Sequence, residues 1–577
     1  MINLKINNIP VSVPEGTTIL EAARVAGVKI PTLCYMKDIN AIGACRICVV
    51  EVKGARSFAA ACVYPVTEGM EVFTDTPKIR QSRKTTLELI LSDHNKDCLS
   101  CERNLHCELQ ALAYEYGCDA KAFSGAVNAS EKDFSTDYLV RDNSKCILCR
   151  RCVAMCNKVQ HCGVINAKMR GFATEIGQAF DVDLADTACA GCGQCINVCP
   201  TGALTEKSEI ENVMQAIADP DKVVIAGVAP SVRVALGEEF GYPIGTDVEG
   251  KMVQALKMLQ FDKVFDVNLT ADLTILEEAN ELIERLTTGG TLPMITSCSP
   301  GWIRFLEYYY PELIPNLSTC KSPQQMFGAI VKTYYAKKMN IDPEKIYVVA
   351  VMPCVAKKFE KTRADEDASG YPDIDAVITT RELAKMIKKS GILFKDIPES
   401  KFDSPLGEYT GAGVIFGATG GVMEAALRTA VETVSGKKLE NVEFKEVRGF
   451  EGVKEATYKA GDVTVNVAVA SGLENASKIC EAIKNGTANY QFVEIMACPG
   501  GCINGGGQPI VDAYTRRNVD YRGLRAKALY ARDESLKERK SHENSECKAI
   551  YDEYLGKPGS HEAHKVLHTS YVARKKY

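Results

Sequence analysis

The sequence predicts a multidomain α+β and α/β protein, with small cysteine-rich domains followed by one large α/β domain. Two observations support this class. Of the 24 cysteines in 577 residues, 17 lie between Cys34 and Cys199, and only seven follow. From about residue 223, short apolar runs of strand length alternate with helical periods, which is typical of an α/β fold with a largely parallel sheet. The length suggests about three to five domains.

Composition and charge exclude several classes of protein. Hydrophobic residues make up 46% and charged residues 25%, the balance of an ordinary globular protein. The net charge of −5 argues against nucleic acid as the main partner, and no apolar run approaches the roughly 20 residues that span a bilayer. The first residues lack the apolar core of a signal peptide, so the predicted location is the cytoplasm. In a reducing compartment, clustered cysteines indicate metal ligands rather than disulfides.

Residues 1–78 are predicted to form small strands around one helix, with a hairpin over residues 5–11 and a helix that begins near Ile19. Four cysteines follow in predicted loops: Cys34, Cys45, Cys48 and Cys62. Four thiolates in this array suit a 2Fe–2S cluster, although their spacing differs from the plant-type ferredoxin pattern. A tetrahedral zinc site is the alternative.

Residues 79–125 form a second predicted domain, which is helical at first and then turns. Its potential ligands are His94, Cys98, Cys101 and Cys107. Zinc fits three thiolates and one imidazole as well as an iron–sulfur cluster does, and His106 competes with His94 for the ligand role. The neighbouring cysteine motifs favour a 4Fe–4S cluster with one histidine ligand.

Residues 126–209 contain a repeat. The run C-x2-C-x2-C-x3-C occurs twice, the second time followed by Pro200, as in bacterial two-cluster ferredoxins, where the fourth cysteine of each run binds the other cluster. The first predicted set is Cys146, Cys149, Cys152 and Cys199, and the second is Cys156, Cys189, Cys192 and Cys195. Residues 1–209 thus predict one 2Fe–2S and three 4Fe–4S clusters in succession, a path for single electrons.

Residues 210–577 are predicted to form the large α/β domain. Its strands are expected at residues 223–228, 263–267, 292–296, 346–351 and 492–496, with helices at 271–286 and 421–431. Three strands lead into Cys298, Cys354 and Cys498, and Cys502 follows closely. Because sites in open α/β sheets form beyond the carboxyl ends of strands, these cysteines are expected to converge on one metal centre. Glycines nearby, such as Gly505, would let the backbone approach it.

At these three motifs the sequence resembles the iron-only (FeFe) hydrogenases, most of all the large monomeric clostridial type. The segments are Thr296–Trp302, Met352–Glu360 and Met496–Pro509, and the resemblance extends over nearly the whole chain, including the order of the predicted clusters. It implies that residues 210–577 hold an H-cluster, a 4Fe–4S cubane bridged through one cysteine sulfur to a two-iron subsite. In this family the subsite carries CO, cyanide and a bridging dithiolate amine.

The resemblance also implies roles for individual residues. Cys354 and Cys498 match cubane ligands, and Cys502 matches the bridging thiolate. Lys357 matches the residue that pairs with a cyanide, for which an ammonium is a suitable donor. The other matches are pocket walls and the thioethers packed on the subsite: Ala229, Pro230, Ser231, Ser322, Pro323, Gln324, Met352, Phe416, Gly417 and Met496.

A proton path is implied by the same resemblance. Cys298 resembles the thiol that passes protons to the bridging amine. The residues that match the rest of the relay are Glu278, Ser318, Glu281 and Arg285. On a helix the three charged members share one face at i, i+3 and i+7, which an exposed amphipathic helix would also explain. If the relay is real, the pKa of Glu278 or Glu281 should be perturbed.

One departure from the family pattern is prominent. The family has two adjacent cysteines before Pro-Gly-Trp, whereas here the pair is Cys298 and Ser299, which places Ser299 at the position of a cubane ligand. An alkoxide is a harder ligand than a thiolate, and a serine hydroxyl is far less acidic than a thiol. Alternatively, Cys298 rotates in as the ligand and the relay loses its thiol. A natural variant, an engineered substitution and an impaired enzyme all fit this pattern.

The implied function is a ferredoxin-linked hydrogenase that reversibly reduces protons to H2. Its partners would be ferredoxin or a similar small electron carrier, and maturation proteins that build the two-iron unit. Because of Ser299, a non-turnover member that senses H2 or redox state, or that only transfers electrons, is the alternative; a zinc-rich structural protein is a third. His561, His564 and His568 lie at helical spacing, and we expect a solvated tail helix there rather than a metal site.

Overall fold

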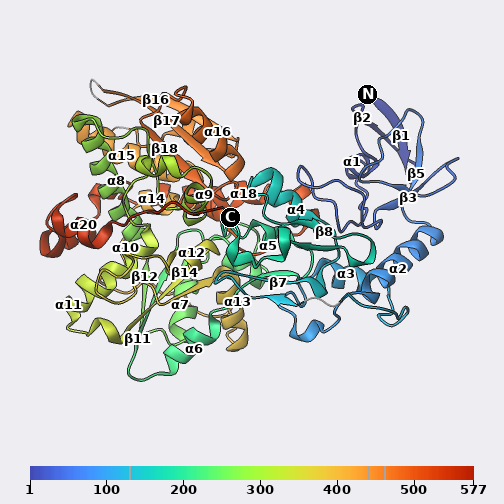
Figure 1. Cartoon of the computed structure of the whole chain (residues 1–577), viewed down its shortest axis with the longest axis horizontal. Helices are drawn as coiled ribbons and strands as arrows, with labels where there is room; N and C mark the ends of the chain where they lie inside the picture. Colours follow the sequence, from blue (N-terminus) through green and yellow to red (C-terminus); the bar gives the residue numbers. More distant parts are fainter. Residues whose placement is uncertain (129–130, 440, 461–462, 577) are drawn as a thin grey trace.

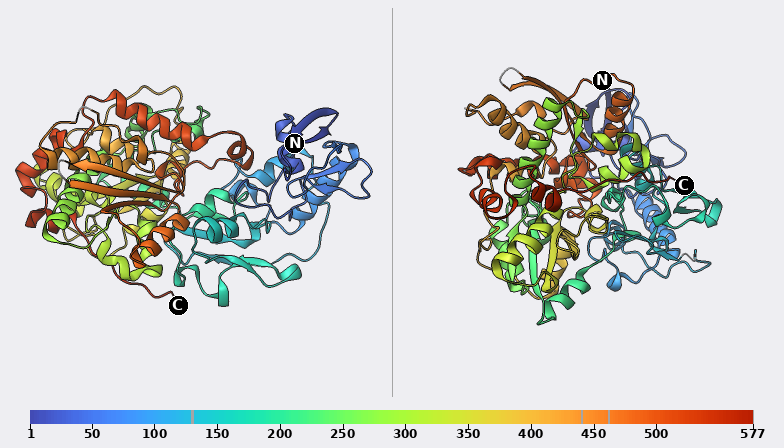
Figure 2. Two further views of the ribbon diagram at one scale, coloured as in Figure 1. Left: turned by 90° about the horizontal axis from the view of Figure 1, so that it is seen from above. Right: turned by 60° about the vertical axis from the view of Figure 1, so that its left-hand side comes forward.

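The computed structural model describes residues 1–128, 131–439, 441–460 and 463–576. Figure 1 shows an elongated molecule in which the cysteine-rich segment, blue to cyan, extends from one side of the larger domain, green to red. The N-terminal strands and the elements that follow them lie together in the part of this segment that is remote from the larger domain (Figure 2).

The N-terminal segment is a five-stranded sheet with one helix. The strands are β1 (Ile2–Ile6), β2 (Ile9–Val13), β3 (Val49–Val52), β4 (Ala59–Ala60) and β5 (Glu71–Phe73), in the order β2-β1-β5-β3-β4. Helix α1 (Ile19–Val25) begins after Thr18, whose hydroxyl accepts a hydrogen bond from the Glu21 N–H at 3.4 Å. The predicted hairpin and helix are both confirmed.

The elements that follow are short. They comprise α2 (Pro77–Ser92), α3 (Glu108–Glu115), α4 (Arg151–Ala154) and α5 (Gln194–Val198), with small strands β6 (Lys132–Asp133), β7 (Leu139–Asp142), β8 (Asn166–Lys168), β9 (Glu175–Gly177) and β10 (Leu204–Glu206). They pair as β10-β7-β6 and β8-β9. Long loops therefore carry most of the cysteines in this part of the chain.

The larger domain contains two four-stranded sheets. The first is fully parallel in the order β12-β11-β14-β15, built from β11 (Val223–Val228), β12 (Lys263–Asp266), β14 (Ile346–Met352) and β15 (Ala376–Thr379). The second has the order β13-β18-β17-β16, from β13 (Met294–Ile295), β16 (Val453–Ala460), β17 (Val463–Ser471) and β18 (Phe492–Met496). Strand β16 runs antiparallel to β17. The predicted strands are all present, whereas β15, β16 and β17 were not predicted.

Helix α8 (Asn268–Thr288) is the central helix of this domain. It contacts α10 (Pro323–Ile330), α14 (Gly411–Ile415) and α15 (Gly421–Ser435). Most of its residues up to Leu282 are buried, including the carboxyl groups of Asp272, Glu277 and Glu278. Because these carboxyl groups are buried, the acidic face of α8 is not the solvent-exposed face of an amphipathic helix, which the spacing of its charges alone would also permit.

The C-terminal residues cover the larger domain instead of extending into solvent. Helix α20 (His561–Leu567) buries Ala563, Val566 and Leu567 and packs on α10. The chain then runs along the domain, where the Thr569 N–H donates to the carbonyl of Thr319 at 2.9 Å. The predicted solvated tail helix was wrong, because the apolar residues between the histidines form a buried face. Among the described residues, no helix combines the length and the apolar character needed to cross a bilayer.

Candidate functional site

The carboxyl ends of five strands meet at one apolar cavity with an empty volume of about 810 Å³. Residues at or shortly after the carboxyl ends of β11, β12, β13, β14 and β18 line it, together with the start of α10 and the residue that follows α14. The predicted residues on its wall are Ala229, Pro230, Ser231, Cys298, Ser299, Pro323, Gln324, Met352, Cys354, Lys357, Phe416, Met496, Cys498 and Cys502. Ser322 is not on the wall but bonds to Lys357, and Gly417 lies behind it, beside Ser231.

Burial raises the pKa values of the cysteine thiols in this cavity. It raises the pKa of Cys502 to about 12 and raises the pKa values of Cys354 and Cys498 as well. Nearby thiols add to the rise at Cys498 and Cys502, because each disfavours a second negative charge close by. These thiols therefore stay protonated unless a cation compensates for their charge, which is the situation in which metal binding displaces protons.

The polar groups on the cavity wall fit an anionic, hydrogen-bonding ligand. The Lys357 ammonium donates to the Ser322 hydroxyl and to Glu360 Oε2, both at 2.7 Å, and to the Cys298 carbonyl at 3.3 Å. Ser231 Oγ and Gln324 Oε1 are buried without a hydrogen-bond partner among the described residues. Buried polar groups normally have hydrogen-bond partners. A bound group with cationic iron and polar ligands would supply partners for the polar side chains of this wall.

Cys298 and Ser299 face different neighbours. Ser299 precedes α9 (Pro300–Tyr309), and its hydroxyl accepts a hydrogen bond from the Ala497 N–H at 3.2 Å, next to Cys498. Burial raises the pKa of Cys298, and the charges of Glu278 and Cys502 raise it further. The Cys298 thiol thus lies between the acidic face of α8 and the cysteines of the cavity.

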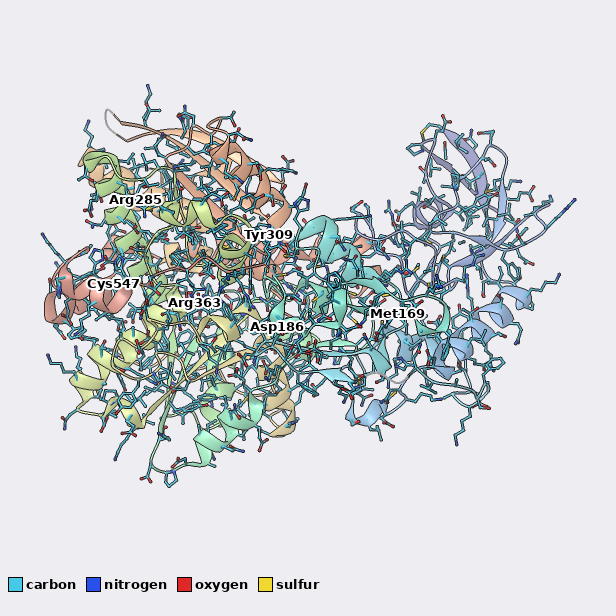
Figure 3. The ribbon with its side chains drawn as sticks, viewed as in Figure 1. Met169, Asp186, Arg285, Tyr309, Arg363 and Cys547 are labelled. Carbon is cyan, nitrogen blue, oxygen red and sulfur yellow. The ribbon has the colours of Figure 1, made fainter. Side chains whose placement is uncertain are left out.

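The acidic side chains of α8 connect to Ser318. The Ser318 hydroxyl donates to Glu281 Oε2 at 2.8 Å, and Arg285 donates to Glu281 Oε1 at 2.7 Å. Burial raises the pKa of Glu278 to about 8, and the charge of Glu281 raises it further. Glu278 is thus the residue at which the expected perturbation occurs. Figure 3 shows Arg285 on the side of the larger domain that is remote from the cysteine-rich segment.

Two smaller cavities contain the doubled cysteine runs. One is lined by Cys146, Cys149, Cys152 and Cys199, and the other by Cys156, Cys189, Cys192 and Cys195. Each cavity therefore holds one of the two predicted sets, including the cysteine from the other run. Cys192 also lines the large cavity, which was not predicted.

A close backbone contact joins the second of these cavities to the large one. A Cβ on Gly506 would lie 2.6 Å from the Cys192 carbonyl oxygen and 2.8 Å from the Gly193 Cα. Only glycine allows this approach. The other wall residues that sequence reasoning missed, such as Val267 and Ala271, carry no signal that distinguishes them from ordinary core residues.

The first two predicted metal sites adjoin the doubled runs. The thiols of Cys34, Cys45, Cys48 and Cys62 interact with one another. The buried amide of Asn40 donates to the carbonyls of Cys34 at 2.8 Å and Cys149 at 3.0 Å, which links the N-terminal site to the first ferredoxin-type cavity.

In residues 79–125, the His94 side chain is partly buried, and this burial lowers its pKa to about 4, so the ring is neutral as a metal ligand must be. Its Nδ1 has no hydrogen-bond partner among the described residues. A Cβ on Gly202 would lie 2.6 Å from Cys101 Sγ, so this segment packs directly against the end of the second cysteine run.

In the described part of the chain, the one group of three or more metal-ligating side chains with ligand atoms within 4.8 Å of one another is Glu281, Cys320 and His568. The eight cysteines of the doubled runs instead line two separate cavities, four to each, as the ligands of two multi-iron clusters would.

Comparison with known proteins decides the family. The model of the iron-only hydrogenase large subunit, C-terminal domain, matches residues 222–506. The chain is 49% identical to NADP-reducing hydrogenase subunit HndD of Solidesulfovibrio fructosivorans over 100% of both chains. It is 44% identical to Iron hydrogenase 1 of Clostridium pasteurianum over 98% of this chain and 99% of that protein. The chain belongs to the iron-only hydrogenase family.

Further matches support the same architecture for this iron-only hydrogenase family member. A 2Fe-2S iron-sulfur cluster binding domain matches residues 1–77, the NADH-ubiquinone oxidoreductase-G iron-sulfur binding region matches 83–121, and a 4Fe-4S dicluster domain matches 115–203. The iron hydrogenase small subunit model matches residues 519–574. An apo variant of the FeFe-hydrogenase HydA1 from Chlamydomonas reinhardtii superposes with a TM-score of 0.57 at 42% identity, over 64% of this chain and 99% of that one. The predicted fold class is confirmed.

Proposed function

We propose that this chain reversibly reduces protons to H2, with electrons supplied through one 2Fe–2S and three 4Fe–4S clusters. The observation that carries the proposal is the large apolar cavity, where Cys354, Cys498 and Cys502 from distant segments meet Cys192 of the ferredoxin-type run. An apolar cavity keeps water away from the reacting centre, and a shared cysteine brings the electron path to its wall.

In this proposal Cys354, Cys498, Cys502 and Ser299 would hold the H-cluster. When bound, that cluster would supply the redox-active iron and a basic amine for proton reduction. The Lys357 ammonium donates a hydrogen bond to an anionic ligand of the subsite, and Glu360 and Ser322 hold it in place. Met352, Met496 and Phe416 close the cavity.

The chain's own acid–base groups carry protons to that centre. Cys298 exchanges protons with the cavity on one side and with Glu278 on the other, as its two neighbouring charges suggest. Ser318 connects Glu278 with Glu281, and Arg285 orients the Glu281 carboxylate through a hydrogen bond of 2.7 Å. A carboxyl with a pKa of about 8 is suited to both giving and accepting a proton near neutral pH.

Electrons are proposed to enter near the cluster of residues 79–125. Leu99 and Leu105, which flank its cysteines, are 95% and 86% exposed, as an apolar docking surface for a protein partner would be. Ferredoxin or a similar cytoplasmic carrier is the proposed partner. The full-length match to an NADP-reducing hydrogenase subunit favours a second candidate, a partner subunit that exchanges electrons with NADP. Rates measured with each donor, ferredoxin or NADPH with a reductase, separate the two.

The test of the main proposal is an anaerobic preparation loaded with the accessory clusters and matured with the two-iron cofactor. We expect infrared bands of CO and cyanide ligands, iron in large excess over zinc, and both H2 evolution and H2 uptake. A fully metallated sample that shows the bands but neither reaction would overturn the function. Zinc in place of iron would overturn the cluster assignments.

Ser299 favours the alternative of a non-turnover sensor or electron-transfer member, and one substitution separates the two. In Ser299→Cys, we expect a thiolate ligand to shift the reduction potential of the cubane. A strong rise in H2 evolution would identify a catalytic scaffold that lacks one ligand. Absence of turnover in both proteins, with the infrared bands present in both, would support the sensor.

A further inference from the structure

The outer end of the proton path has no suitable group if it stops at Arg285. This guanidinium donates to Glu281 Oε1 at 2.7 Å and to the Leu317 carbonyl at 2.6 Å, so it holds the carboxylate in place. A guanidinium keeps its proton at any working pH and offers no lone pair to accept another. Arg285 therefore positions Glu281, and protons need a different route between Glu281 and solvent.

Histidines of the C-terminal segment lie beside Glu281. Ligand atoms of Glu281, Cys320 and His568 are within 4.8 Å of one another. The His568 ring is also bonded at both nitrogens, Nδ1 to the Thr319 hydroxyl at 2.7 Å and Nε2 to Glu277 Oε2 at 3.3 Å. The hydrogen bonds to Thr319 and Glu277 hold the His568 ring next to Glu281.

A second histidine, His564, lies next to His568 and is closer to solvent. The rings of His564 and His568 lie 4.0 Å apart between centroids. Glu278 and Ser318 are fully buried, the side chains of Glu281 and His568 are 13% and 8% exposed, and His564 is exposed to solvent. Exposure therefore increases along this series of polar side chains, from the interior to the surface.

We propose that His568 and His564 form the solvent end of the proton path, with Arg285 as a positioning residue. This inference rests on the proposed hydrogenase function. During H2 evolution, His564 takes a proton from water and passes it to His568, which gives it to the Glu281 carboxylate. The Ser318 hydroxyl accepts that proton on its oxygen as it gives its own to Glu278, and Glu278 protonates Cys298. Two protons travel this way for each H2, and both electrons arrive through the clusters.

The backbone holds His568 in this place. The Lys321 N–H donates to the Leu567 carbonyl at 2.8 Å, and the Thr569 N–H donates to the Thr319 carbonyl at 2.9 Å. Residues 320 and 568 also form an antiparallel bridge. The segment that carries Ser318 and the segment that carries His568 are therefore fixed to each other, as a proton path with short steps requires.

The charges around the pair are mostly acidic. Glu277, Glu281 and Glu284 of α8 face the histidines, and Cys320 and Tyr551 complete the surroundings. Burial and the charge of His568 lower the pKa of His564, while the three carboxylates oppose that shift. A histidine whose pKa lies at or below its ordinary value releases its proton readily near neutral pH.

The test uses the matured holoenzyme and a small dye as electron donor, so that electron entry does not limit the rate. We expect His568→Ala to reduce H2 evolution about 10-fold or more, to increase the solvent isotope effect, and to recover activity when imidazole is added. His568→Gln keeps side-chain hydrogen-bonding atoms but has no ring to protonate, and it should be equally slow. His564→Ala should have a smaller effect, and His561→Ala on the same helix should have none.

A second measurement does not depend on turnover. In protein with ¹⁵N-labelled histidines, the titration of His568 should change on Glu281→Gln and on His564→Ala, because the three groups share protons. An active wild type with an unchanged rate in His568→Gln would overturn the inference alone, and so would a slow His568→Ala that imidazole does not rescue and whose isotope effect is unchanged. An inactive wild type with a complete set of infrared bands would instead overturn the proposed function.

Discussion

The two halves of this molecule gather cysteines in different ways. In residues 126–209 eight cysteines lie in two short runs, and tight turns with positive φ, at Leu148, Arg150 and Gly193, bend the chain around each cavity. In the larger domain the cysteines follow strands β13, β14 and β18, which are separated by much of the domain. A local motif can thus make a cluster site from one short segment, whereas the large cavity exists only when the whole domain has folded.

Removing one cysteine from each half tests this difference most severely. We expect Cys354→Ala to lower H2 evolution by about 10³-fold or more, because the cavity loses a ligand for the cubane itself. Cys146→Ala should lose ferredoxin-driven activity but keep the infrared bands and much of the dye-driven activity. Loss of those bands in Cys146→Ala would show that the two halves are not independent.

The proposed proton path lies in the larger domain, and Glu278→Gln removes its buried acid. General acid–base groups contribute about 10²–10⁴-fold to rates, so a loss in that range is expected, with no loss in the surface control Glu474→Gln. Electron transfer into the accessory clusters, measured by their reduction rate, should be unchanged. A variant that evolves H2 at the wild-type rate would exclude Glu278 from the path.

The raised pKa of Glu278 predicts that H2 evolution and protein stability depend on pH. Its carboxyl is protonated below a pH of about 8 and ionised above it, so H2 evolution should fall as the pH rises through that value. In Glu281→Gln the residual activity should fall at a lower pH, because the charge that helps to raise the pKa of Glu278 is gone. The folded-state pKa also exceeds the ordinary value of 4.5, so stability should decrease as the pH rises from 4.5 to about 8. That decrease should be smaller in Glu278→Gln, as measured by chemical denaturation.

The contact between the halves depends on Gly506. In Gly506→Ala the added Cβ meets backbone atoms of Cys192 and Gly193 at less than 3 Å, so the two cavities must move apart. We expect ferredoxin-driven turnover to fall about 10- to 100-fold, with the infrared bands retained. Gly125→Ala, where no atom lies within 4 Å of the added Cβ, is the matched control. Equal rates in the two variants would mean that electrons do not cross at this contact.

The smallest effect is expected at the contact between the N-terminal site and the first ferredoxin-type cavity. Asn40→Ala leaves the carbonyls of Cys34 and Cys149 without their shared donor, at a cost of about 1–3 kcal/mol for each unpaired group. The N-terminal segment should then exchange amide hydrogens faster, as mass spectrometry would show, while dye-driven activity stays the same. Asn518→Ala on the surface should change neither, and unaltered exchange in Asn40→Ala would contradict the proposed link.

Local spacing made half of the molecule predictable. The two runs assigned Cys156 and Cys199 to opposite sets, and each is found in the cavity predicted for it. Strands β11 and β14 were visible because parallel strands buried on both faces are continuous apolar runs. Strand β16 alternates polar with apolar residues and is partly exposed, so it lacked that signal.

What could not be predicted depends on contacts between distant segments. The second role of Cys192 requires Gly506 to reach it from another domain. The position of His568 requires its bridge to Cys320, and periodicity within residues 561–568 says nothing about that partner. The burial of Glu278 likewise comes from the elements packed around α8, while its spacing to Glu281 is equally compatible with solvent exposure.

The C-terminal segment lies across parts of the chain that are synthesised much earlier. Its Arg574 N–H bonds to the Glu307 carbonyl at 2.9 Å, and Tyr571 donates to the Cys320 carbonyl at 3.3 Å, close to the cavity cysteines. On the ribosome, residues 1–209 can fold and acquire iron while later residues are still being added. The segments that carry Glu307 and Cys320 therefore gain these hydrogen bonds only after residues near 570 have been added.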